Sequence, residues 1–192
     1  MSLFDDDMSS EVRTGGDWLH HREHRDPVCG PAQDEVGVPA LSSFLLARTA
    51  EVVIAIRGIA AHSDGLLLSV AVLFADEQRN EDLGWSMRDF SRSPGRFRFG
   101  VVQSDGRSAT VGTRDAPPLR ADDGPVLLLL TSTSSALRWD GEYWLHPLPP
   151  EGQLVLGCRW PDRGVDETLV EIDALPLVKA AATSNPVWTT SP

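Results

Sequence analysis

The chain has few cysteines and no long apolar stretch, and each shortage excludes a class of protein. It is 192 residues long and contains two cysteines, which is too few for the disulfide framework of a small secreted domain. The longest apolar run, residues 66–75, has about half of the roughly 20 residues that a membrane-spanning helix needs. Acidic residues lie near the N-terminus, where a secretory signal would carry positive charge. We therefore expect a soluble cytoplasmic protein.

Basic residues are also in short supply. The chain contains 17 Lys and Arg residues and 28 Asp and Glu residues, which gives a formal net charge of −11. Residues 1–37 alone contain nine acidic residues and three arginines. Binding to a nucleic-acid backbone or to an anionic membrane requires clustered Lys and Arg side chains. We expect neither a nucleic acid nor a membrane among the partners of this chain.

Local catalytic motifs are missing as well. The sequence has no Gly-x-Ser-x-Gly elbow, no phosphate-binding Gly-x-x-x-x-Gly-Lys-Ser/Thr loop and no Gly-x-Gly-x-x-Gly after a strand. Only His62 and His146 offer an imidazole base within the expected folded body. Four potential zinc ligands cluster near the N-terminus, but no apolar stripe there would hold a helix against a core; they are His20, His21, His24 and Cys29. We predict no enzymatic activity, no cofactor and no metal.

What the sequence does contain is a repeated turn dipeptide. Asp-Gly lies between strand-like runs at Asp64-Gly65, Asp105-Gly106 and Asp140-Gly141. A two-residue hairpin loop of the favoured type needs positive φ at both central positions, which Asp tolerates and Gly adopts without steric cost. The three dipeptides predict three β-hairpins.

Alternating apolar residues extend this prediction along the chain. Period-two patterns favour strands, and about nine of them fit between residues 45 and 182, with 131–135 as a small polar link. Strands of this density favour an all-β fold, an antiparallel two-sheet β-sandwich of immunoglobulin-like kind. Asp173 is placed to cap a short C-terminal helix over residues 175–182. We predict a flexible acidic tail at residues 1–40 and a C-terminal tail at 183–192, because both have little apolar surface to bury.

Aromatic residues gather around the third predicted hairpin, and they are the candidate recognition site. Successive strand residues point to opposite faces of a sheet, so Tyr143 and Trp144 are expected to lie one inside and one outside the sandwich. Exposed rings in this hairpin would form a platform for a partner or a sugar. The candidate ligand-binding or partner-binding residues are Arg138, Trp139, Tyr143, Trp144 and His146.

The second half of the chain resembles a group of uncharacterised actinobacterial proteins of unknown function. The resemblance rests on residues 138–150, 158–161 and 167–174 and extends over about residues 45–182. It implies a bacterial source, and it implies no activity, cofactor or site residue.

These observations favour a non-enzymatic protein-protein interaction module. Such a module would use an unpaired sheet edge, as in strand addition, or the hairpin aromatics. The alternative is a small-ligand or carbohydrate-binding domain that uses the same aromatics, and a hydrolase is the least favoured. The identity of the partner, the oligomeric state and the order of the strands are left open by the sequence.

Overall fold

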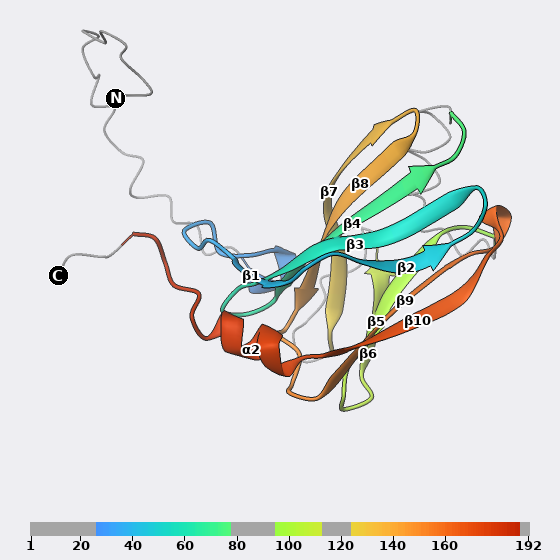
Figure 1. The fold of residues 1–192 in the computed structure, drawn as a ribbon. Coiled ribbons are helices and arrows are strands. Elements are labelled where there is room, and N and C mark those ends of the chain that lie inside the picture. Colours follow the sequence, from blue (N-terminus) through green and yellow to red (C-terminus); the bar gives the residue numbers. More distant parts are fainter. Residues whose placement is uncertain (1–25, 78–94, 113–123, 189–192) are drawn as a thin grey trace, which may run out of the picture.

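The computed structural model describes residues 26–77, 95–112 and 124–188, which form ten strands, one short α-helix and two 3-10 turns (Figure 1). The strands are β1 (Val38–Leu41), β2 (Phe44–Arg48), β3 (Val52–Ala61), β4 (Leu66–Phe74), β5 (Arg98–Val102), β6 (Ser108–Gly112), β7 (Val126–Ser135), β8 (Arg138–His146), β9 (Gln153–Trp160) and β10 (Val165–Asp173). The helix is α2 (Leu175–Ala181), and the 3-10 turns are η2 (Pro27–Cys29) and η4 (Pro161–Arg163).

The strands form one mixed, curled sheet in the order β1-β3-β4-β8-β7-β6-β5-β9-β10, with β2 also paired to β3. All pairings are antiparallel except the one between β6 and β7, which joins Val111 to Leu127 and Gly112 to Leu128. Strand β10, at one end of this order, contacts β2 at the other end. Figure 1 shows β3, β4, β8 and β7 side by side in the upper half and β5, β9 and β10 below them.

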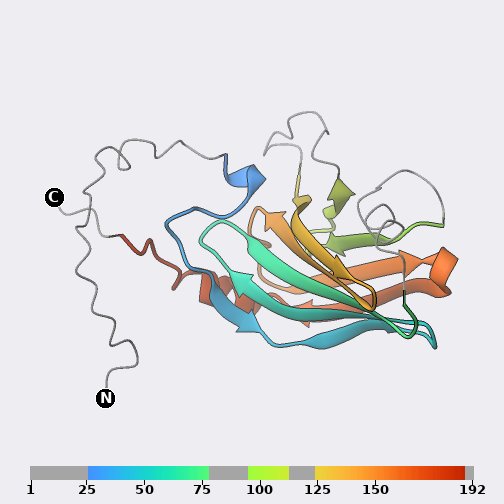
Figure 2. The ribbon, with the colours of Figure 1, turned by 90° about the horizontal axis from the view of Figure 1, so that it is seen from above.

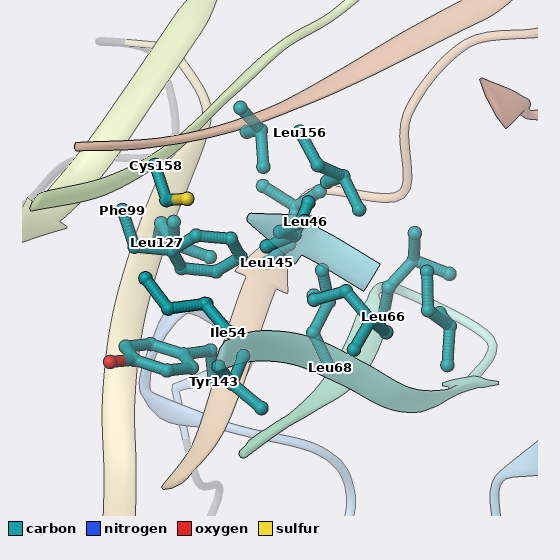
Figure 3. Packing of buried hydrophobic residues seen from close by; sticks show 14 of the residues in the cluster. Leu46, Ile54, Leu66, Leu68, Phe99, Leu127, Tyr143, Leu145, Leu156 and Cys158 are labelled. Atoms are coloured by element: carbon teal, nitrogen blue, oxygen red, sulfur yellow. The ribbon is translucent and has the colours of Figure 1, made fainter. Parts of the chain in front are cut away.

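One hydrophobic core fills the inside of this curled sheet. Side chains from β2, β3, β4 and β8 meet side chains from β5, β7 and β9, and Figure 3 shows Tyr143 and Phe99 pointing into this space. The two rings pack with their centroids 5.0 Å apart. Burial of large apolar side chains contributes on the order of 1.5–3 kcal/mol each, so this cluster holds the two halves of the sheet together.

Two of the three predicted hairpins are confirmed, between β3 and β4 and between β5 and β6. Gly106 has the predicted positive φ, of 82°. Gly65 does not, because the backbone N–H of His62 donates to the carbonyl of Gly65 and the turn is centred on Ser63 and Asp64. The C-terminal helix is also confirmed, and the carboxylate of Asp173 accepts a 2.9 Å hydrogen bond from the backbone N–H of Leu175. The structure is all-β apart from this helix, as predicted. The immunoglobulin-like two-sheet sandwich is not confirmed, because the parallel β6–β7 pairing makes the sheet continuous and mixed.

The third predicted hairpin is wrong in its position. Asp140 and Gly141 lie inside β8, the chain turns at Ala136 and Leu137, and the predicted polar link at 131–135 belongs to β7. Glycine is required at position 141 for its small size and not for a turn conformation. The buried indole of Trp139 lies over it, and a Cβ added at Gly141 would come within 2.7 Å of the ring atom Cζ3.

The boundary of the predicted N-terminal tail also needs correction. Residues 1–25 lie outside the described residues, but residues 26–40 pack against the sheet. Val28 in η2 is buried, and β1 pairs with β3. Figure 2 shows this blue segment running around one end of the strands, beside the turn between β3 and β4. We call residues 26–37 the covering segment. In the predicted C-terminal tail, Pro186 bridges to Glu35 and the N–H of Val187 donates to the carbonyl of Asp34.

The close approach of Trp139 to Gly141 generates a stability prediction. Substitution Gly141→Ala forces a methyl group into a buried ring, so the free energy of unfolding should fall by about 1–3 kcal/mol, as measured by urea denaturation. Gly58→Ala is the matched control on β3, because the added Cβ would meet only the carbonyl oxygen of Leu41 at 3.4 Å. The control should leave stability unchanged or raise it by up to about 1 kcal/mol. Equal losses in the two variants would contradict this account of Gly141.

Candidate functional site

The predicted aromatic site is not an exposed patch. Trp139 and Tyr143 point into the core, and Trp144 points to the outer face of the sheet, yet all three are buried. The expectation that one of the adjacent rings lies outside in solvent is therefore wrong, although the two rings do point to opposite faces. The physical reason is that the covering segment buries the outer face at this end of β8.

The covering segment is attached to Trp144 directly. The indole N–H donates a 2.8 Å hydrogen bond to the carbonyl of Pro27 in η2. The ring makes an edge contact with His62, at 5.6 Å between centroids, and stacks on His146 at 6.5 Å. Both histidines are buried. The structure thus brings Trp144 and His146 together, but as part of a closed contact between the sheet and the covering segment.

Arg138, the fifth predicted site residue, belongs to a network of side-chain ion pairs on the outer face of β3, β4 and β8. Its guanidinium makes two hydrogen bonds to Asp140, of 2.7 and 2.9 Å. Arg57 contacts Asp140 at 3.3 Å and Glu142 at 3.0 Å, and Ser69 donates to Glu142 at 2.8 Å. Hydrogen bonding to Arg138 lowers the pKa of Asp140. Two arginines and two carboxylates neutralise one another here, so Arg138 is not a free receptor for an anionic ligand.

A polar cluster lies under the covering segment next to Trp144. Glu35 accepts hydrogen bonds from the backbone N–H of Ser63 at 2.8 Å and from its hydroxyl at 3.0 Å. The Nδ1 atom of His62 lies 3.8 Å from Glu35 Oε2, and the backbone of Gly37 is packed against the His62 ring. The hydroxyl of Ser184 donates to the carbonyl of Val36. Side chains from both ends of the chain therefore close over the β3–β4 turn.

Three buried polar atoms in this cluster have no hydrogen-bond partner among the described residues, namely His62 Nδ1, His146 Nδ1 and Asp64 Oδ1. Burial lowers the pKa of His62, against the opposing effect of Glu35, and burial raises the pKa of Asp64. For Glu35, burial acts to raise the pKa, but contacts with Ser184, Ser63 and His62 outweigh it and the net shift is downward. The cluster therefore favours a neutral His62 beside an ionised Glu35.

A second surface, which the sequence analysis did not select, exposes apolar side chains. Leu169 on β10 is 60% exposed and Val102 on β5 is 40% exposed. They lie on the outer face of three adjacent antiparallel strands, which we call the β5–β9–β10 face. Its central residues, in cross-strand register, are Arg98, Gly100 and Val102 on β5, Arg159, Gly157 and Val155 on β9, and Leu169 and Glu171 on β10.

The pattern of β10 contained the information needed to find this surface. Leu169 has the same parity as Glu171 and Asp173, and alternation places all three on the outer face. An apolar residue in a series of exposed acids is the sequence signal of an exposed apolar site. Trp188, 68% exposed next to Val187, was also missed, because it lies in a segment that the sequence assigned to a tail.

No group of three or more His, Cys, Asp or Glu side chains within the described ranges is arranged to hold a metal ion. The candidate ligands His20, His21 and His24 lie outside those ranges. None of the helices described here is long and apolar enough to span a membrane. No family model, curated protein or solved structure matches this chain, so the resemblance to actinobacterial proteins stays a prediction.

The buried histidine generates a prediction on pH dependence. A histidine whose pKa is lower in the folded state binds fewer protons than it does when unfolded, so stability falls as the pH drops below about 6.5, the ordinary histidine pKa. The free energy of unfolding should decrease between pH 7 and pH 5, and His62→Gln should make this decrease smaller. Urea denaturation at each pH measures both slopes. The lowered pKa of Glu35 acts in the same direction, but in a more acidic range.

Trp144→Phe is the matched control for this experiment, because it disturbs the same cluster without removing a titrating group. Loss of the hydrogen bond to Pro27 leaves a buried carbonyl without its partner and should cost about 1–3 kcal/mol at every pH. The pH slope should remain that of the wild-type chain. A slope that is the same in His62→Gln and in the wild type would rule out His62 as its source.

Proposed function

We propose that this protein is a non-enzymatic protein-protein interaction module that uses the β5–β9–β10 face. The observation that supports this most directly is the exposure of Leu169 and Val102 on a surface built from paired strands. Apolar side chains on a rigid face, with charged residues around them, are typical of the centre and rim of a protein interface. A face held by backbone pairing binds with little loss of conformational entropy.

The polar groups of the chain give less support to catalysis. Burial raises the pKa of the Cys158 thiol to about 11, which makes it a poor nucleophile at neutral pH. His62 and His146 are buried beneath the covering segment. The chain contains two cysteines, too few for a disulfide framework, and a reducing compartment suits such a chain, so a cytoplasmic location is part of the proposal.

The small-ligand alternative loses its main support. It depended on exposed aromatic rings in the β7–β8 hairpin, and Trp139, Tyr143 and Trp144 are buried. The binding experiments can still distinguish this alternative from a protein partner. Saturable thermal stabilisation by a sugar or another small molecule, without any captured protein, would favour it, because a ligand that binds only the folded state stabilises that state by mass action.

The proposed surface is tested by a quantitative pull-down from a bacterial lysate with the immobilised full chain. Leu169→Asp should reduce the amount of any specific partner by about tenfold or more, the loss expected when an apolar contact at the centre of an interface is replaced by a charge. Leu137→Asp is the matched control, because Leu137 is a leucine of similar exposure, 47%, in the distant β7–β8 turn. Equal capture by the wild type and Leu169→Asp would contradict the proposal.

A further inference from the structure

The covering segment is attached to the sheet by few contacts. None of its residues belongs to a strand, and Val28 is its one buried apolar side chain. Hydrogen bonds join it to the sheet at Pro27, which accepts from Trp144, and at Glu35, which accepts two bonds from Ser63. A region with few buried apolar contacts opens locally at a lower free energy than the core of the same protein. The covering segment can therefore open while the strands stay paired.

The imidazole of His62 is in contact with both the covering segment and Trp144. The residue is only 4% exposed. Its Nε2 atom lies against the backbone of Gly37, where an added Cβ would come within 2.4 Å of that nitrogen. The ring also makes the edge contact with Trp144, at 5.6 Å between centroids. Departure of the covering segment would expose the imidazole to water on the side of Gly37.

The closed arrangement accommodates a protonated His62 poorly. A protonated imidazole has two N–H donors. The Glu35 carboxylate lies 3.8 Å from Nδ1, beyond hydrogen-bond distance, and its oxygens already accept two bonds from Ser63. Asp64 in the β3–β4 turn is the other carboxylate that acts on His62, and it also interacts with His146 of β8. Burial outweighs the attraction of both carboxylates, so the pKa of His62 stays below its ordinary value.

Opening of the covering segment removes this conflict. The Nδ1 atom of His62, which has no hydrogen-bond partner among the described residues in the closed state, can then bond to water, and the pKa of the imidazole rises toward its ordinary value of about 6.5. A proton that binds more tightly in the open state favours that state by linkage. The closed state is therefore favoured above about pH 6.5 and becomes less favoured as the pH falls below it.

We infer that the covering segment is a pH-sensitive cover, which protonation of His62 releases from the sheet while the strands stay paired. Release uncovers Trp144, one of the residues that the sequence selected for recognition. This aromatic side chain is then closed at neutral pH and accessible at acid pH. The inference differs from a general loss of stability, because the sheet remains folded, and it is independent of the function proposed for the β5–β9–β10 face.

Indole N–H exchange, followed by NMR on the full chain, tests the inference with three tryptophans. Trp144 reports on the covering segment, Trp139 in the core reports on unfolding of the sheet, and the exposed Trp188 gives the reference rate at each pH. Relative to Trp188, Trp144 should exchange about three- to twentyfold faster at pH 5 than at pH 7, within the limit set by one histidine of ordinary pKa. Urea below the unfolding transition should accelerate exchange at Trp139 and hardly change it at Trp144, because local opening exposes little surface.

Two variants separate the titrating group from the attachment of the segment. His62→Gln keeps a polar side chain but cannot titrate, so the pH effect on Trp144 exchange should shrink to less than about twofold. Asp26→Ala is the matched control, because it removes the carboxylate that accepts from the N–H of Val28 and caps η2. Trp144 should then exchange about fivefold faster at both pH values, the effect of losing a typical N-cap, and the ratio between the two pH values should stay that of the wild type.

Either of two results would overturn the inference. If Trp144 and Trp139 exchange at the same rate and with the same urea dependence, the covering segment leaves only when the whole sheet unfolds. If the pH effect persists unchanged in His62→Gln, another group binds the proton. The comparison of the two tryptophans is made in the wild type, so it does not depend on the folding of His62→Gln. Neither result bears on the β5–β9–β10 face, which the pull-down with Leu169→Asp tests separately.

Discussion

The structure depends on the burial of both faces of β8 at its C-terminal end. Tyr143 and Leu145 point into the core, and Trp144 between them points the other way, where the described strands form no second layer. An indole needs both apolar surroundings and a partner for its N–H, and Pro27 supplies the partner. The covering segment is therefore part of the fold. The closed polar cluster of Glu35 and His62 is a consequence of that arrangement.

Two parts of the outer surface differ in how far they are covered. At the Trp144 end, the covering segment and the residues around Pro186 close over the sheet. Next to it, Arg57 and Arg138 are paired with carboxylates. The β5–β9–β10 face has a different character, with an exposed Leu169 and arginines that face each other. This contrast is why we propose that the β5–β9–β10 face serves recognition, while the aromatic residues of β8 are part of the packing of the fold.

Local patterns in the sequence predicted much of the fold, and contacts between distant segments explain what they missed. Hairpins form at Asp64 and at Asp105-Gly106 because strand patterns flank each of these turns on both sides. Asp140-Gly141 has the same local chemistry, but its glycine lies under a ring two residues away, which the dipeptide does not encode. The burial of Trp144 depends on Pro27, 117 positions earlier in the chain. The sequence therefore identified the aromatic residues of β8 as important, but it did not predict that the covering segment buries Trp144.

Hydrogen exchange of the tryptophan indole N–H groups, followed by NMR on the full chain, tests the central claim most directly. The Trp144 indole should exchange far more slowly than that of the exposed Trp188, because its N–H is released only when the covering segment opens. Equal and rapid exchange at Trp144 and Trp188 would show that the outer face of β8 is open in solution. The aromatic residues of β8 would then return as a candidate recognition surface beside the β5–β9–β10 face.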